Sequence, residues 1–204
     1  MNDSIQFFET QFRKQLASSD LRLNPFETMA LRHLPSQGRV LDFGCGLGNL
    51  SIAAARGGCA VLALDAAPSA VAHLAAQADR ENLPIRALQA DLRTYRIDAG
   101  FDAVVAIGLL MFFDRATALR QLDGLKACVR PGGVAIVNVL VEGTTYLDMF
   151  DPAEYYLFGR TELRDAFGGW SLVAESFDDR PAPADTVKRF ATLVARKPAS
   201  PSGP

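Results

Sequence analysis

The chain has 204 residues, of which 49% are hydrophobic and 22% charged, and its formal net charge is −2. This composition is typical of ordinary globular proteins, and the length fits a single α/β domain with a substantial core. The basic residues are scattered along the chain, whereas a protein that reads nucleic acid usually carries a basic stripe. We therefore expect no nucleic-acid partner.

Three cysteines, Cys45, Cys59 and Cys128, occur without a Cys-x-x-Cys pair. Their odd number and their spacing argue against a disulfide framework and against a metal site, so a reducing compartment is expected. The N-terminal segment MNDSIQFFETQFRK is mixed in charge and lacks the apolar core of a signal peptide. No apolar run approaches the roughly 20 residues that span a bilayer. We therefore expect a cytoplasmic protein without a membrane partner.

The first two predicted elements are helices, at Ser4–Ala17 and Pro25–Leu34. From residue 39 onward, short apolar runs alternate with stretches of helical periodicity. The runs that indicate strands are Arg39–Phe43, Ala60–Leu64, Ile85–Ala90, Phe101–Ile107 and Val134–Leu140. The helices between them are predicted at Asn49–Arg56, Pro68–Glu81 and Ala116–Cys128, with Pro68 in a first turn and Asp114 as a cap. Such alternation indicates a parallel sheet with right-handed crossovers.

The last third of the chain departs from this alternation. A helix at Thr161–Phe167 is followed by two strand-like runs, Trp170–Phe177 and Val187–Ala195, with a linker rich in Asp and Pro between them. Two strands so close in sequence should pair as a hairpin, so the last strand should run antiparallel to the rest. We expect a Rossmann-like α/β fold: a seven-stranded, mostly parallel sheet with helices on both faces. It should form one domain over residues 1–197, with residues 1–38 as a potential lid and residues 198–204 as a disordered tail.

A glycine loop, Gly44, Gly46 and Gly48, follows the first strand and precedes a helix. In open α/β sheets ligands bind at this place, and glycine lets the backbone approach them closely. The spacing is not that of a dinucleotide fingerprint, because the third glycine comes one residue early and Asn49 takes its position. A P-loop is also excluded, since no Gly-Lys-Ser/Thr follows. Asp42 could fix the loop or meet a ligand's ammonium group, whereas Cys45 is expected to fill a tight turn.

Two acidic residues and an apolar ledge follow the next strands. Asp65 ends the second strand and could accept hydrogen bonds from ribose hydroxyls or cap the helix near Pro68. Asp91 ends the third strand and could accept a hydrogen bond from an adenine amino group or be a plain loop acid. Ile107, Gly108 and Leu109 could support an adenosyl group after the fourth strand. Together these features predict an adenosyl-cofactor site.

These segments in order resemble the class I S-adenosylmethionine-dependent methyltransferases. The matching segments are VLDFGCGLGN, ALDAA, QADL, FDAVVAIGLL and VRPGGVAIVNVL, and the resemblance runs from Val40 to about Ala195. It implies S-adenosyl-L-methionine as the cofactor and a small-molecule substrate. The cofactor-binding residues it implies are Asp42, Gly44, Cys45, Gly46, Gly48, Asn49, Asp65, Ala66, Asp91, Leu92, Ile107 and Gly108.

A narrower group of segments is similar to the small bacterial tellurite-resistance methyltransferases. These segments are ENLPIRALQADL, GLLMFF, TELRDAFGGW and KRFATLVARK. The similarity implies tellurite, selenite or another soft nucleophile as the methyl acceptor. That family's C-terminal linker carries a histidine and arginines implicated in the reaction, whereas DDRPAPADTV has no histidine and only Arg180. The insert EGTTYLDMFDPAEYYLF also differs from the family's version.

The acceptor pocket should be walled by side chains that lie over the strand ends. Candidates are Phe8, Phe12, Met111, Phe112, Tyr146, Phe150 and Tyr155, with Arg160 and Arg180 as groups that could neutralise an oxyanion. No catalytic base is predicted, because His33 and His73 are expected to be surface or core residues; this fits a soft or anionic acceptor. The alternatives are an O- or N-methyltransferase of a metabolite, a non-catalytic cofactor-binding sensor, and an NAD-linked reductase.

Overall fold

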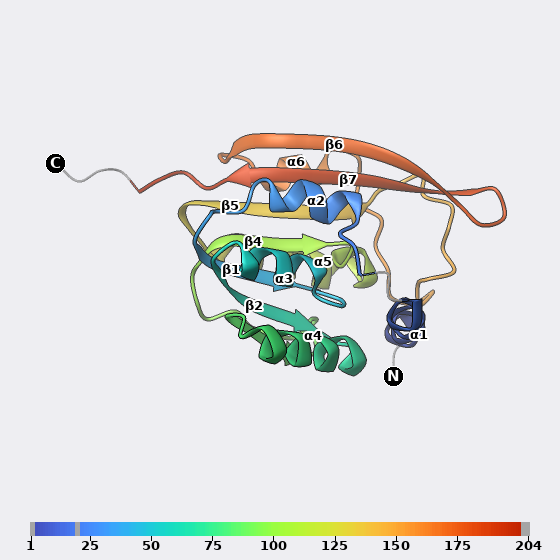
Figure 1. Cartoon of the computed structure of the whole chain (residues 1–204). Helices are drawn as coiled ribbons and strands as arrows, with labels where there is room; N and C mark the ends of the chain where they lie inside the picture. The colour runs from blue at the N-terminus through green and yellow to red at the C-terminus, as the bar shows by residue number, and fades with distance from the viewer. Residues whose placement is uncertain (1–2, 19–20, 201–204) are drawn as a thin grey trace.

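The centre of the molecule is a seven-stranded sheet with the order β3-β2-β1-β4-β5-β7-β6 (Figure 1). The computed structural model describes residues 3–18 and 21–200, so residues 201–204 of the predicted disordered tail lie outside the described part. The strands are β1 Gly38–Phe43, β2 Cys59–Asp65, β3 Ile85–Gln89, β4 Phe101–Ile107, β5 Val129–Leu140, β6 Ser171–Ala182 and β7 Thr186–Arg196. The helices are α1 Asp3–Ser18, α2 Pro25–Leu31, α3 Asn49–Arg56, α4 Pro68–Glu81, the 3-10 helix η1 Leu110–Phe112, α5 Arg115–Cys128 and α6 Glu162–Ala166.

The strand directions agree with the predicted Rossmann-like fold. Strands β1 to β5 pair in parallel, and β7 is antiparallel to both of its neighbours, β5 and β6. Consecutive parallel strands are joined through helices or long loops, as parallel pairing requires. The carboxyl ends of β1, β2 and β4 therefore meet at one edge of the sheet, which is where the predicted site lies.

The C-terminal hairpin is longer than the sequence predicted. The segment expected to be an Asp- and Pro-rich linker mostly continues β6, and only residues 183–185 connect β6 to β7. Pro181 still pairs with Val187, which is possible because β6 is an edge strand, where proline is tolerated. Ala184 and Asp185 have φ values of +56° and +55°, so the tight connection is made in the left-handed region.

Both faces of the sheet are covered, which explains the nearly continuous apolar runs in the strands. On one face, Leu41 and Val104 pack in a cluster with Leu122 of α5 and Leu163 of α6. On the other face, Val40 and Val105 pack in a second cluster with residues of α2, α3 and α4, namely Ala30, Leu50, Ile52, Ala54, Ala55 and Leu74. Alternate residues of each strand thus serve the two clusters.

Several helix ends lie where the sequence predicted them. Pro68 occupies the first turn of α4, and the Asp114 side chain accepts a hydrogen bond from the backbone N–H of Thr117 at 3.1 Å. Helix α2 ends three residues earlier than predicted, at Leu31. Pro35 follows closely, and a residue before proline is disfavoured in the helical conformation, so Leu34 cannot easily continue the helix.

Helix α1 lies beyond the carboxyl edge of the sheet, where Figure 1 shows it nearly end-on beside α4. Its Phe12 and Leu16 pack against Leu47, Ala67 and Ala70, which belong to the glycine loop and the start of α4. The helix therefore covers the edge at which the strands end. None of the helices in the described residues is both long and apolar enough to cross a membrane.

Candidate cofactor site

The glycine loop folds back over the end of β2. The backbone N–H groups of Gly44 and Cys45 both donate to the carbonyl oxygen of Leu64, at 2.8 and 2.9 Å. Gly44 has a φ of +87°, and a Cβ there would lie 2.9 Å from Leu109 Cδ2. Side chains larger than hydrogen are therefore excluded by conformation and by space. Gly48, with a φ of +76°, caps α3 and faces Leu74.

The Asp65 carboxylate joins this loop to α4. Its Oδ2 accepts a hydrogen bond from the Gly46 N–H at 2.8 Å, and its Oδ1 accepts one from the Ala67 N–H at 2.9 Å. Burial raises the pKa of Asp65, whereas the hydrogen bonds from Ala67 and Gly46 oppose this rise. The side chain thus holds the start of α4, as one of its two predicted roles requires, and it also lines the cavity described below.

Asp42 is a buried carboxyl group beneath the loop. Its Oδ2 accepts a hydrogen bond from Ser51 Oγ at 2.6 Å. Burial raises the pKa of Asp42 to about 7, and the negative charges of Glu27 and Asp65 add to the effect. Burial also raises the pKa of Glu27, which belongs to the capping box of α2. Three carboxyl groups therefore line one part of the cavity, and this arrangement favours a cationic ligand group there.

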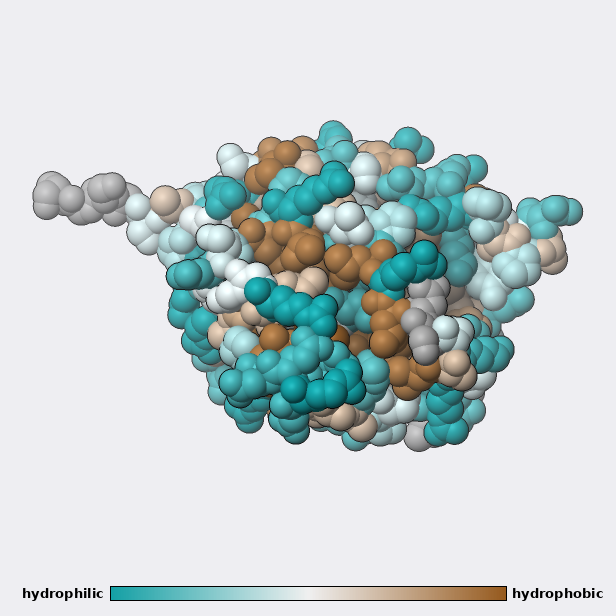
Figure 2. Space-filling view, viewed as in Figure 1, coloured by the Kyte–Doolittle hydropathy of each residue, from teal (hydrophilic) through white to brown (hydrophobic). Residues whose placement is uncertain are grey.

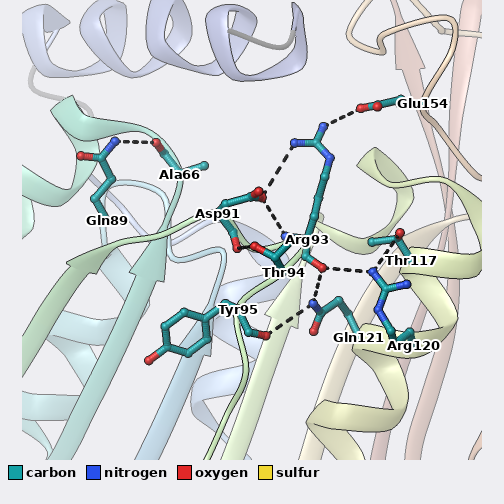
Figure 3. A network of polar contacts seen from close by, with 10 residues as sticks. All are labelled: Ala66, Gln89, Asp91, Arg93, Thr94, Tyr95, Thr117, Arg120, Gln121 and Glu154. Carbon is teal, nitrogen blue, oxygen red and sulfur yellow. Dashed lines mark hydrogen bonds and ion pairs between the residues drawn. The ribbon is translucent and has the colours of Figure 1, made fainter.

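The loop after β3 is held by a chain of polar contacts that reaches α5 and the insert before α6 (Figure 3). Asp91 Oδ1 accepts a hydrogen bond from the Arg93 N–H at 3.0 Å, and the Arg93 guanidinium pairs with Glu154 at 2.8 Å. The carbonyl oxygen of Arg93 accepts hydrogen bonds from Gln121 Nε2 at 2.7 Å and Arg120 Nη2 at 3.1 Å. These contacts fix the position of Asp91 at the cavity.

A cavity of about 350 Å³ opens between the glycine loop, the strand ends, α1 and α2. This volume is within the range of small-molecule sites. On the face drawn in Figure 2, hydrophobic residues reach the surface over α1 while most of the surroundings are hydrophilic. Of the cofactor residues predicted from the sequence, all except Gly48 line the cavity: Asp42, Gly44, Cys45, Gly46, Asn49, Asp65, Ala66, Asp91, Leu92, Ile107 and Gly108.

Part of the cavity wall is aromatic. Three of the predicted acceptor-pocket residues, Phe8, Phe12 and Phe112, line it, and the rings of Phe8 and Phe112 meet edge to face at 5.0 Å. Phe26 and Phe190, whose ring centroids are 4.8 Å apart on the same wall, were not predicted from the sequence. Asn138 of β5 was not predicted either. A polar residue in the otherwise apolar run VAIVNVL was the available signal for Asn138.

The other predicted acceptor residues do not line this cavity. Met111 and Phe150 are buried behind Phe112 in an apolar cluster that Tyr146 and Tyr155 also contact. The Arg160 guanidinium lies over the ring of Phe177 at 4.7 Å, on the C-terminal hairpin. The Arg180 guanidinium lies over the ring of Phe26 at 4.6 Å, behind the cavity wall. Among the described lining residues there is no histidine, and no described group of His, Cys, Asp and Glu side chains could hold a metal ion.

The known proteins that the chain matches include several methyltransferases. A family model described as a methyltransferase domain matches residues 40–133. The chain is 26% identical to the probable S-adenosyl-L-methionine-dependent methyltransferase TehB of Haemophilus influenzae, over 78% of this chain and 57% of TehB. It is 34% identical to a cypemycin N-terminal methyltransferase of Streptomyces over 62% of this chain and 48% of that protein. Hemagglutinin 1 of Eikenella corrodens is 27% identical over 78% of this chain and 55% of its own length.

Solved structures agree with these matches. The crystal structure of TehB from Haemophilus influenzae superposes with a TM-score of 0.73 at 22% identity, covering 86% of this chain and 62% of that one. By its sequence matches the chain is similar to class I S-adenosylmethionine-dependent methyltransferases, and the solved structure shows the same fold. The chain is similar to the TehB type, as the sequence resemblance predicted. The chain spans about half the length of the curated relatives it matches.

These matches favour a methyltransferase, whose methyl donor is S-adenosylmethionine, over the reductase raised by the sequence. The fold comparison also confirms the seven-stranded Rossmann-like sheet. The residues at the cavity fit this cofactor by chemistry: a glycine loop that a Cβ would crowd, carboxyl groups suited to a cation, of which Asp42 is buried and Asp65 and Glu27 half-buried, and an apolar surface at Ile107.

Proposed function

We propose that this methyltransferase transfers a methyl group to a small organic acceptor held at the aromatic part of the cavity. The proposal rests on one observation: a single cavity has both a polar wall and an aromatic wall. Carboxyl groups and the glycine loop form one part, and the rings of Phe8, Phe112 and Phe190 form the other. An acceptor with an apolar body would gain by burial against these rings, whereas a bare oxyanion would lose its hydration there.

The cofactor residues are assigned by their chemistry. Asp65 is placed to accept hydrogen bonds from the ribose hydroxyls, and Asp42 with Glu27 to neutralise the amino-acid ammonium group. Asp91 and Leu92 border the part of the cavity next to Phe113, which suits the adenine ring. Glycine backbone at 44 and 46 allows the cofactor to approach without meeting a Cβ.

S-adenosylmethionine supplies a methyl group that is already activated by a sulfonium leaving group. What remains for the chain is to align the acceptor and to exclude water. Helix α1 is suited to that task, since Glu9 Oε1 accepts a hydrogen bond from the Ser69 N–H at 3.0 Å and Phe12 lies over the glycine loop. We include residues 1–38 in the same domain as 39–197 and assign α1 the role of a lid.

Tellurite or selenite is the second candidate acceptor. It is favoured by the similarity to TehB and by two cationic residues that lie opposite each other in the β6–β7 hairpin: Arg180, which lies over Phe26, and Lys188. Against it stand Asp42, Asp65 and Glu27, whose charges repel an anion that enters the cavity. The organic acceptor is therefore the primary proposal.

Two measurements test the proposal. Calorimetric titration with S-adenosylhomocysteine should show binding, and titration with NAD should not. Incubation with methyl-labelled S-adenosylmethionine and a panel of amines, phenols, thiols, tellurite and selenite should then label an organic acceptor. Label transfer to tellurite or selenite alone would replace the primary proposal by the second. Binding without transfer to any acceptor would contradict both.

The three cysteines are free and buried, which supports the reducing, cytoplasmic setting expected from the sequence. A small-molecule acceptor also fits the similarity of the fold to a Burkholderia thailandensis methyltransferase solved with 1,6-didemethyltoxoflavin, at a TM-score of 0.63 and 20% identity. The cytoplasmic location and the organic acceptor remain parts of the proposal.

A further inference from the structure

Asn138 is a buried polar residue at the point where the aromatic wall meets the sheet. It lies on β5 between Ile107 of β4 and Thr192 of β7, and its side chain is 0% exposed. Its neighbours on the same face of β5 are Ile136 and Leu140, both buried. The polar atoms of an amide buried among apolar side chains should each have a hydrogen-bond partner, because buried polar groups are nearly always hydrogen-bonded.

The Asn138 amide is only half satisfied by the protein. Its Nδ2 donates a hydrogen bond to Thr192 Oγ1 at 2.8 Å, and in this orientation Oδ1 is the amide atom left without a protein partner among the residues the structure describes. Asn138 is nevertheless part of the cavity wall, together with Phe26, Phe112 and Phe190. A ligand in the cavity can supply the missing donor when the wall shifts enough to expose Oδ1, which is buried in this structure.

A carbonyl oxygen accepts hydrogen bonds and cannot donate one. It attracts an N–H or O–H group and repels an oxyanion, so it selects between acceptor classes. The electron-rich faces of the surrounding phenyl rings also repel an oxyanion. The carboxyl groups of Asp42 and Glu27 on the same cavity act in the same direction.

We propose that Asn138 determines acceptor specificity by accepting a hydrogen bond from a primary or secondary amine with an apolar body. The inference rests on the proposed function and names its substrate class. The acceptor binds as the neutral amine, whose N–H points to Asn138 Oδ1 and whose lone pair is free. The nitrogen attacks the methyl carbon; the new N–C bond forms as the C–S bond breaks, and the electron pair of that bond stays on sulfur. The ammonium form of the acceptor has already lost one proton to water before it binds, so the product leaves as a methylammonium ion that keeps its proton, and one proton is released overall.

Asn138 is thus a positioning residue, and its effect depends on the acceptor having an N–H. A tertiary amine such as N,N-dimethylphenethylamine has a lone pair but no N–H in its neutral form. The wild-type enzyme should methylate phenethylamine or N-methylphenethylamine with a kcat/KM at least about thirtyfold above that for the tertiary amine. This comparison uses the unchanged protein and needs no variant to fold.

Three variants separate hydrogen bonding from packing. Asn138→Leu keeps the branched shape and removes the carbonyl, so it should lower kcat/KM for phenethylamine about ten- to hundredfold. The ratio of kcat/KM for phenethylamine to that for the tertiary amine should fall as well. Asn138→Asp keeps acceptor oxygens and should retain most of the activity. Thr192→Val releases Nδ2 and should have a smaller effect, because the carbonyl remains but is less well oriented.

Binding provides a readout besides activity. Titration of N-methylphenethylamine into the complex with S-adenosylhomocysteine should show about tenfold weaker binding for Asn138→Leu than for Asn138→Asp. The affinity for S-adenosylhomocysteine itself should stay within about threefold of wild type in both variants, which also reports that they fold.

The outcomes distinguish the inference from the function on which it rests. If wild type methylates phenols, thiols or selenite but no amine, the inference is overturned and the methyltransferase function stands. Equal use of secondary and tertiary amines, or unchanged amine kinetics in Asn138→Leu, overturns it as well. If S-adenosylhomocysteine binds but no acceptor is labelled, the proposed function fails and the inference falls with it.

Discussion

Asp42 combines complete burial with a position on the cofactor cavity, so its ionisation should govern cofactor affinity. Its pKa is raised to about 7, and an ammonium group bound beside it would stabilise the ionised form. Affinity for S-adenosylhomocysteine should therefore rise with pH between about 6 and 8 and then level off. Titration calorimetry across this range, in buffers of different ionisation enthalpy, should also show proton release on binding below pH 7. A flat profile would contradict the placement of the ammonium group at Asp42.

The same carboxyl group predicts the opposite trend for stability without ligand. Because folding raises its pKa, the native state binds the proton more tightly than the unfolded chain does, and stability falls as pH rises from about 4 to 7. Asp42→Asn should remove this slope, stabilise the apoprotein by about 1–3 kcal/mol at pH 8, and weaken ligand binding. Urea unfolding at several pH values is the measurement. If Asp42→Asn leaves the slope in place, Asp65 and Glu27, whose pKa values burial also raises, are its source.

Asp65 holds two backbone groups and faces the cavity, so its substitution should have two separable effects. Asp65→Ala should weaken S-adenosylhomocysteine binding by about 1.5–3 kcal/mol, since it removes charged hydrogen bonds to the ribose. It should also lower the melting temperature, because the N–H groups of Gly46 and Ala67 lose their acceptor. Calorimetry and thermal unfolding measure the two effects. Lower stability with unchanged affinity would leave Asp65 only the role of holding the start of α4.

At the scale of elements, the contact between α1 and α4 should control how long the cofactor stays bound. Glu9 accepts a hydrogen bond from the Ser69 N–H in the first turn of α4, where a negative charge is favourable. Glu9→Gln should speed release of S-adenosylhomocysteine about three- to tenfold with little loss of stability. Surface plasmon resonance can measure the release rate. Arg13→Ala is the matched control, since Arg13 contacts Glu9 from the exposed side of α1 and should change the rate much less.

The elements that local patterns specify were predicted well, and those set by distant contacts were not. Strands such as Phe101–Ile107 and the cap at Asp114 depend on neighbouring residues, so the sequence sufficed. The continuation of β6 to Ala182 depends on pairing with β7, which overrides the prolines of the linker. Asn138, Phe26 and Phe190 meet only after β5, α2 and β7 come together, and no spacing in the sequence relates them. The acceptor side was therefore predicted less completely than the glycine loop.

At the scale of the whole molecule, the sheet and α1 are separate sources of stability. The two large apolar clusters on the faces of the sheet include residues of α2 to α6 and of the strands, whereas α1 packs on smaller clusters over the site. Removing α1 should therefore leave a folded sheet with an open cofactor site. The lid role of α1 depends on this separation, because a helix that the core required could not move without unfolding.

A variant that begins at Leu23 should unfold cooperatively but bind S-adenosylhomocysteine about tenfold more weakly, because Phe12 no longer covers the glycine loop. Ligand stabilises the native state by mass action, by about 4.1 kcal/mol at a concentration 1,000 times the dissociation constant and by about 2.7 kcal/mol at 100 times. A ligand concentration about 1,000 times the wild-type dissociation constant is only about 100 times that of the truncated variant. The ligand should therefore stabilise the variant by about 1.4 kcal/mol less than the wild type at that concentration. Thermal unfolding with and without ligand measures this difference for both proteins. Equal stabilisation would mean that α1 contributes nothing to holding the cofactor, and loss of cooperative unfolding would mean that it belongs to the core.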